Sequence, residues 1–378
     1  MLAETFLSVG MKIYDNDWFL THQLEPEQAA DVLKAMGVTW VIAQSRFLPM
    51  ADSAVDSAVR KSDRERYASL DDVAFRRALK DRGIAYFAVL NICFDPAFAA
   101  RHPELLPVDQ FGRREETQDW YVGLPPDLEE NLRHKIGLLE RAVAALDPDG
   151  VHLGFVRWPG FWETWLPDVR RSEMPEYCYS QTTLAAFAAA TGSTVPLIEP
   201  VQAAREIAQR YRAEWRDWKC GVTVEAIRRI RAAVDKGRHV QVSINTLPFF
   251  RNDFDNAVEE VVGQDVVRLR DVVDVFEVMA YHQILAKGAE WPAAIASDIR
   301  ARSRKAAVCT LQTRPLYLEG MHAGRSETLD AREFCRAIDA VERSDVDGVC
   351  IFTFADLLDL MGSSAGNRMI ERLRRFRR

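Results

Sequence analysis

Short apolar runs alternate with longer amphipathic stretches along the whole chain. The runs are rich in β-branched and aromatic residues, which favours strands, and the longer stretches space apolar residues three and four apart, which favours helices. Eight such runs lie at residues 6–14, 39–44, 84–92, 150–158, 239–247, 275–282, 306–313 and 348–354. Strands that alternate with helices predict βα units around a parallel sheet. Eight units predict an α/β fold of the (β/α)8 type, a TIM barrel.

End signals of the amphipathic stretches support this pattern. Residues 26–37 begin with Pro in the first turn and end in Gly, and residues 71–83 open with acids and close with bases. Both arrangements are typical of helix ends. Residues 127–147 carry one apolar stripe that can lie against a sheet.

One domain accounts for the chain's 378 residues, because barrels commonly run from about 200 to over 400 residues. The longest gap between strand runs follows the fourth, and it holds helical stretches at residues 183–192 and 201–236. We therefore expect a single barrel domain, residues 1–378, with a helical insertion at about 160–237. The alternative is a second small domain in this gap.

Composition narrows the class of protein and its partners. The chain is 48% hydrophobic and 28% charged, which is typical of a globular protein, and its net charge is -7. Basic residues gather only at 371–378, which we interpret as the solvated face of a last helix, so no nucleic-acid partner is expected. No signal peptide and no long apolar window is recognisable, which predicts a cytoplasmic protein without a membrane partner.

The six cysteines are scattered without CxxC spacing, and three of them lie in apolar strand-like runs. This pattern favours buried free thiols over disulfides or zinc ligands. We expect no metal and no cofactor.

In barrel enzymes the active-site groups come from the C-terminal ends of the strands and the loops that follow. Here those positions mix polar groups with large aromatics, the combination that binds sugars, because rings pack on C–H faces while polar groups bond hydroxyls. The predicted substrate-binding residues are Lys12, Asp17, Trp18, Gln44, Asn91, Gly154, Trp158, Trp162, Asn245 and Tyr281.

Lys12 points into the barrel if the first strand alternates. A buried lysine needs a partner charge, which Glu277 or Asp15 could supply. Strand alternation points Glu277 to the same face as Tyr281, the barrel interior. Glu277 lies four residues earlier, which places it about 13 Å deeper in the barrel. A structural ion pair is therefore its better interpretation.

Two long motifs resemble a known family. The run from Asp149 to Pro159, DGVHLGFVRWP, resembles the fourth strand of bacterial glycoside-hydrolase-like barrels, whose usual form is DG-[IV]-x-LDF-x-R-[YW]-P. The run 274–282, DVFEVMAYH, is similar to the same group's strand-six element, and residues 263–265 and 347–352 also match. The resemblance implies a carbohydrate substrate. Gly154 stands where the family pattern has Asp, and Val156 stands where chitinase-like barrels carry a catalytic Glu.

Glycoside hydrolysis normally uses two carboxyl groups. We choose Glu163 first and Asp15 second as general acid or base, since an aromatic surround can raise a carboxyl pKa. Arg157 would orient a carboxylate or a substrate hydroxyl, His282 could hydrogen-bond the sugar or the catalytic acid, and Tyr281 could stabilise developing charge.

Three functions remain open at this point. The first is a glycosidase acting on a poly- or oligosaccharide, and the second is a carbohydrate-binding barrel that has lost catalysis at Gly154. The third is another barrel enzyme, such as a lyase or isomerase of sugar-like substrates, with Lys12 or His282 as base.

Overall fold

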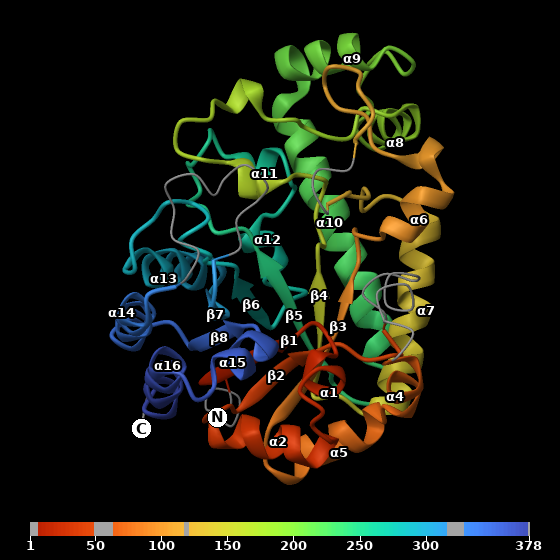
Figure 1. Cartoon of the computed structure of the whole chain (residues 1–378). Coiled ribbons are helices and arrows are strands. Elements are labelled where there is room, and N and C mark those ends of the chain that lie inside the picture. The colour runs from red at the N-terminus through yellow and green to blue at the C-terminus, as the bar shows by residue number, and fades with distance from the viewer. Residues whose placement is uncertain (1–6, 49–62, 117–120, 316–328, 377–378) are drawn as a thin grey trace.

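The computed structural model describes residues 7–48, 63–116, 121–315 and 329–376. Eight parallel strands pair in chain order, β1 with β2 through to β8 with β1, and close a barrel with helices on its outside (Figure 1). This confirms the predicted (β/α)8 fold. The strands are β1 (Val9–Ile13), β2 (Trp40–Ala43), β3 (Ala85–Asn91), β4 (Gly150–Gly154), β5 (Gln241–Thr246), β6 (Val275–Val278), β7 (Ala306–Gln312) and β8 (Gly348–Phe352).

The helices follow the signals in the sequence. Asp71 caps the helix that the acids and bases predicted, where its side chain accepts from the Ala74 N–H. The helices are α1 (Asp17–Leu20), α2 (Pro26–Ala35), α4 (Arg64–Ser69), α5 (Asp72–Asp81), α6 (Pro96–Arg101), α7 (Glu129–Leu146), α8 (Gln181–Thr191), α9 (Pro200–Glu206), α10 (Arg212–Val234), α11 (Ala257–Glu260), α12 (Val266–Leu269), α13 (Trp291–Ser303), α14 (Ala331–Glu342), α15 (Phe354–Leu360) and α16 (Ser364–Arg374). Within the described part of the chain, no helix is both long and apolar enough to cross a membrane.

Two aromatic side chains in the barrel wall pack directly against glycines of neighbouring strands. A Cβ at Gly10 would lie 2.4 Å from the Trp40 ring, and one at Gly150 would lie 2.4 Å from the Phe87 ring. Glycine is therefore required at both positions, because each ring fills the space that a side chain would take. The six cysteines are free thiols, five of them buried and Cys335 partly exposed, as predicted.

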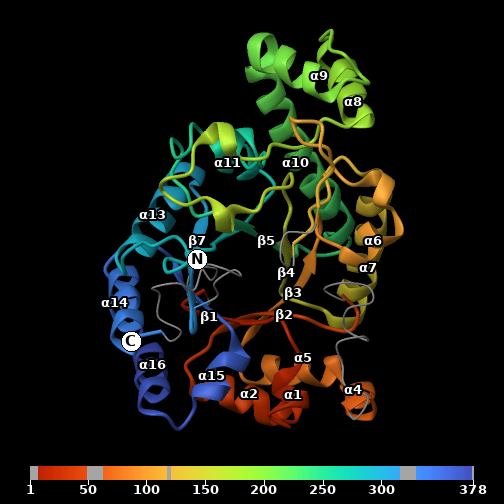
Figure 2. The same ribbon diagram turned by 45° about the horizontal axis from the view of Figure 1, so that its top comes forward.

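The segment between β4 and β5 combines an insertion, α8 and α9, with a helix of the barrel itself, α10. The helices α8 and α9 stand away from the barrel, and α10 runs from them down to it (Figures 1 and 2). Toward the barrel α10 packs against α7 and α12, so its lower part is the barrel's own helix after β4. A π-helical turn at Ile207–Tyr211 joins α9 to α10.

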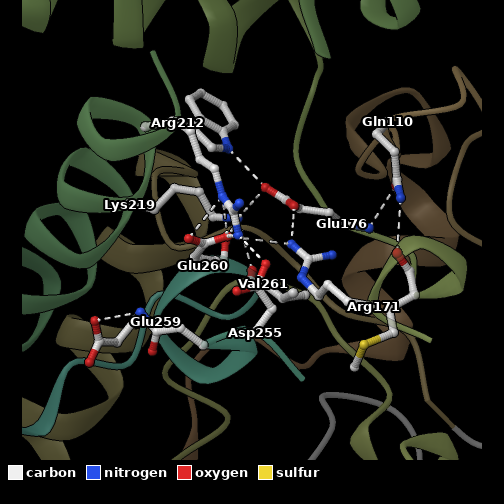
Figure 3. Close-up of polar contacts among 12 residues, drawn as sticks. Gln110, Arg171, Glu176, Arg212, Lys219, Asp255, Glu259, Glu260 and Val261 are labelled. Atoms are coloured by element: carbon white, nitrogen blue, oxygen red, sulfur yellow. Dashed lines mark hydrogen bonds and ion pairs between the residues drawn. The ribbon is translucent and has the colours of Figure 1, made fainter. Parts of the chain in front are cut away.

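A buried charge cluster ties this segment to the barrel (Figure 3). Glu176 accepts hydrogen bonds from Arg171 Nη2 (2.5 Å) and Trp215 Nε1 (3.0 Å), and its carboxylate lies 3.5 Å from the Lys219 ammonium. The Lys219 side chain is fully buried and donates to the backbone carbonyls of Glu260 (2.8 Å) and Val261 (2.9 Å). The cluster therefore joins the loop after β4 and helix α10 to the loop after β5.

Removing the carboxylate charge should loosen this junction. We expect Glu176→Gln to lower the free energy of unfolding by about 3 kcal/mol, because the fully buried Lys219 would keep its charge without this counterion. Urea denaturation measures the change, with Glu173→Gln as an exposed control. Equal stability of the two variants would mean that the charge cluster does not hold the segment.

Candidate active site

The backbone adopts a costly conformation where β4 ends. Phe155 follows the last residue of the strand and has a φ of 53°. A bulky residue keeps left-handed backbone only where its surroundings hold it, most often at functional sites. Its N–H donates to Asn245 Oδ1 (3.2 Å), and its carbonyl accepts from the Arg157 N–H (2.9 Å). The chain is thus fixed at the C-terminal end of β4, where the sequence predicted the site.

Arg157 lies buried two residues further on, with 2% of its surface exposed. Its Nε and Nη1 make no hydrogen bond within the described residues, and its guanidinium carbon lies 4.9 Å from the centroid of the Phe155 ring. A buried guanidinium with unmade hydrogen bonds is costly to keep. Its N–H groups remain able to bond a carboxylate or a sugar hydroxyl.

Glu163 stands on the short 3-10 turn Trp162–Thr164 beyond this point. The residue is 8% exposed, and its Oε2 has no hydrogen-bond partner among the described residues. Burial raises the pKa of Glu163 to about 7, and the charge of Arg157 opposes this rise. The carboxyl can therefore both hold and release a proton near neutral pH, as a general acid must.

Stacked aromatic rings surround this part of the rim. The Tyr121 ring stacks on Phe161 with 5.4 Å between centroids, and also on Phe94 (6.2 Å) and Phe155 (5.9 Å). Its phenol oxygen accepts a hydrogen bond from the Gly160 N–H (3.2 Å). The charge of Glu163 acts on Tyr121, so these rings lie near the Glu163 carboxyl.

A second group of predicted residues meets around Lys12. Its ammonium lies 3.0 Å from a carboxylate oxygen of Glu277 and 3.5 Å from the Tyr281 hydroxyl. The ion pair with Glu277 is confirmed. Tyr281 in turn packs against Trp162 (6.0 Å between centroids) and Phe352 (5.5 Å). The structure therefore brings Lys12, Tyr281 and Trp162 together.

Asn91 and Gly154 are paired across β3 and β4 and share one space inside the barrel. A Cβ added at Gly154 would lie 2.2 Å from Asn91 Oδ1. That oxygen is buried and has no hydrogen-bond partner among the described residues. An amide oxygen of β3 thus lies close to where a side chain at position 154 would begin.

Asp15, Asp17 and Gln44 follow the first two strands. Burial raises the pKa of Asp15 to about 6, and the hydrogen bond from the Asp17 N–H opposes the rise. Asp17 is exposed, and its carboxylate accepts from Thr21 Oγ1 (3.0 Å), whereas Gln44 is buried. Of these three, Asp15 has the electrostatic environment of a reactive group.

His282 faces a carboxylate that sequence reasoning did not predict. Its Nε2 lies 2.9 Å from an oxygen of Glu333 on α14, while its Nδ1 is buried without a hydrogen-bond partner in the described chain. Burial lowers the pKa of His282, and Glu333 opposes this effect. Burial therefore favours the neutral imidazole.

Trp18 and Trp158, which we predicted as sugar-binding residues, both make packing contacts. Trp18 stacks on Phe75 of α5 with 4.6 Å between centroids, and only 2% of it is exposed. Trp158 is completely buried, and its Nε1 donates to the Lys219 carbonyl (3.0 Å). Large rings after strands often close the space between strands and helices, and the contacts of Trp18 and Trp158 are of this kind.

Glu115 is a buried carboxyl that the sequence did not reveal. It lies in the irregular segment between α6 and α7, where no periodicity marks a buried position. Burial raises the pKa of Glu115 to about 8, and the Gly123 N–H, which donates to its Oε2 (3.2 Å), opposes the rise. Its charge also acts on Tyr121, so it belongs to the same rim as Glu163.

Comparisons with known proteins agree on the fold. No family model and no curated protein matches the chain. Among solved structures, it is similar to the glycoside hydrolase domain of PgaB (BpsB) from Bordetella bronchiseptica, with a TM-score of 0.67, 14% identity, and 97% of this chain and 99% of that chain covered. It is also similar to a β-galactosidase from Marinomonas ef1, with a TM-score of 0.66 and 14% identity, and to the family GH42 β-galactosidase Gan42B of G. stearothermophilus, with 0.60 and 11%.

These alignments differ in how much of the other protein they include. The match covers 97% and 98% of this chain but only 59% and 56% of the two β-galactosidases. At these identities the likeness concerns the fold. The chain is thus a (β/α)8 barrel of the shape found in solved glycoside hydrolases.

Proposed function

We propose that the protein is a glycoside hydrolase that cleaves an oligo- or polysaccharide, with Glu163 as general acid. The observation that carries this proposal is the buried Glu163 carboxyl, whose pKa is raised to about 7 and whose Oε2 has no partner among the described residues. A protonated carboxyl near neutral pH can donate its proton to the leaving oxygen of a glycosidic bond.

The second carboxyl in this proposal is Asp15. Burial raises the pKa of Asp15 to about 6, and Asp15 would serve as base or nucleophile beside Glu163 as acid. Glycosidases normally use two carboxyls, one as general acid and the other as base or nucleophile. Arg157, beside Glu163, would then hold the ionised form of the acid after proton transfer.

Aromatic and polar groups at the same rim support a sugar as substrate. Trp162 and Tyr281 pack side by side, and Asn245 lies at the end of the neighbouring β5. Rings of this kind can pack on the C–H faces of a pyranose, while Lys12 and Asn91 would orient its hydroxyls from inside the barrel.

The direct test is product release from a broad panel of oligo- and polysaccharides, measured as new reducing ends. We expect at least one glycan to be cleaved by the protein and not by the double variant Asp15→Asn/Glu163→Gln. Glu259→Gln, at a buried carboxylate outside the proposed site, is the matched control and should cleave like the parent protein. Failure of the parent protein on every glycan, or equal release by the double variant, would refute the proposal.

One observation favours a second function, a carbohydrate-binding barrel without hydrolysis. Gly154 supplies no carboxylate, and Asn91 Oδ1 lies where a Cβ at that position would be. In this case the rim would hold a glycan without cleaving it. Saturable glycan binding by calorimetry, with no new reducing ends after prolonged incubation, would support this function.

The coupling of Asn91 and Gly154 is itself testable. We expect Gly154→Asp alone to be destabilised by about 1–3 kcal/mol, because the new side chain overlaps a buried amide. The double variant Asn91→Gly/Gly154→Asp should recover part of this loss, which urea denaturation of both variants would show. A single variant as stable as the parent would mean that Asn91 moves aside without cost.

A further inference from the structure

A basic groove lies on the outside of the barrel, between α14 and α16, away from the strand ends. It is a cavity of about 560 Å³. Its lining residues are Arg332, Cys335, Arg336, Asp339, Arg368, Glu371, Arg372 and Arg375. Five arginines thus face two carboxylates in a chain whose net charge is -7.

Part of this positive charge is neutralised within the protein. Arg372 contacts Asp339 and Glu342, each at 2.6 Å, and Arg375 contacts Glu371 at 2.6 Å. From sequence we interpreted residues 371–378 as the solvated face of a last helix; in the structure Arg375, which follows α16, is exposed, whereas Arg372 is partly buried. Arg372 and Arg375 also line the groove.

The other three arginines of the groove differ from Arg372 and Arg375 in their surroundings. Arg332, Arg336 and Arg368 are exposed, and none of them has an ion pair or side-chain hydrogen bond to another described residue. Arg332 and Arg336 are four residues apart on α14 and so lie on one face, where like charges repel. Cys335 of α14 lines the same cavity as these arginines.

We propose that this groove binds a phosphate group, either free phosphate or the phosphate of a small molecule. Three guanidinium groups offer many N–H donors in planar forks, and a phosphate offers a double negative charge and at least three acceptor oxygens. A carboxylate would satisfy only one of these forks. The cavity is also large enough to hold a small organic group attached to the phosphate.

Titration calorimetry at constant ionic strength tests this proposal, first with inorganic phosphate and then with glucose 6-phosphate. We expect saturable binding with a dissociation constant of about 1 mM or below. The double variant Arg332→Gln/Arg336→Gln should bind at least about tenfold more weakly, since two of the three cations are gone. Arg77→Gln removes an exposed arginine of α5 and should bind like the parent protein.

The thiol of Cys335 provides a second readout that does not depend on variants. It is the partly exposed cysteine, whereas the other five are buried. Bound phosphate should slow its alkylation by iodoacetamide, followed by mass spectrometry of the peptide that contains it. The proposal fails if neither ligand binds saturably or if Arg332→Gln/Arg336→Gln binds as tightly as the parent protein. It also fails if phosphate leaves the alkylation rate of Cys335 unchanged. Tighter binding of glucose 6-phosphate than of phosphate would identify a phosphorylated small molecule as the ligand.

Discussion

Replacing Glu163 by glutamine is expected to slow glycan cleavage by about 100- to 10,000-fold, because glutamine keeps the shape of the side chain but cannot donate a proton. The rate is measured as kcat on the best natural glycan of the panel and on an aryl glycoside with a good leaving group. The aryl glycoside should lose far less activity, since its departure needs no acid. An equal loss on both substrates would argue against Glu163 as general acid.

The same variant offers a check on folding. The pKa of Glu163 is raised in the folded state from 4.5 to about 7, so the stability that its bound proton contributes is lost as the pH rises through this window. Glutamine does not ionise. Glu163→Gln should therefore be more stable than the parent protein at pH 8, by about 3 kcal/mol, and nearly equal to it at pH 4. A less stable variant at pH 8 would mean that the carboxylate is needed for folding.

Replacing Glu277 by glutamine should have the largest effect on stability. We expect a loss of about 3–5 kcal/mol in the free energy of unfolding, because Lys12 would keep its buried charge without the carboxylate 3.0 Å away. The exposed fractions of the two side chains are 1% and 0%. Burial alone would lower the pKa of Lys12, but the Glu277 charge raises it above its ordinary value.

A double-mutant cycle separates the charge effect from packing. Lys12→Met/Glu277→Gln removes both charges and should be more stable than Glu277→Gln alone, with the gain read from urea denaturation curves. Additive losses in the two single variants would contradict a strong ion pair.

The fold could be predicted because its signals are local. Each predicted strand run contains an observed strand, and the helix at 71–83 was marked by charges at its ends. Lys12 and Glu277 could be paired in advance because both positions have inward parity and a buried charge needs a partner.

The site was less predictable because it depends on contacts between distant segments. Nothing local distinguishes Trp162, which packs on Tyr281, from Trp158, which bonds to the Lys219 carbonyl of α10. Glu115 lies in a segment without periodicity, so its burial follows only from tertiary packing. The overlap between Asn91 and Gly154 likewise required the register of β3 and β4.

The pH dependence of kcat/KM for glycan cleavage tests the central claim most directly. With Glu163 as general acid and its pKa near 7, the rate should fall above about pH 7 in the parent protein, and this fall should be absent in Glu163→Gln. The same fall in the variant, or a flat profile from about pH 5 to pH 9 in the parent protein, would contradict the assignment of Glu163 as the catalytic acid.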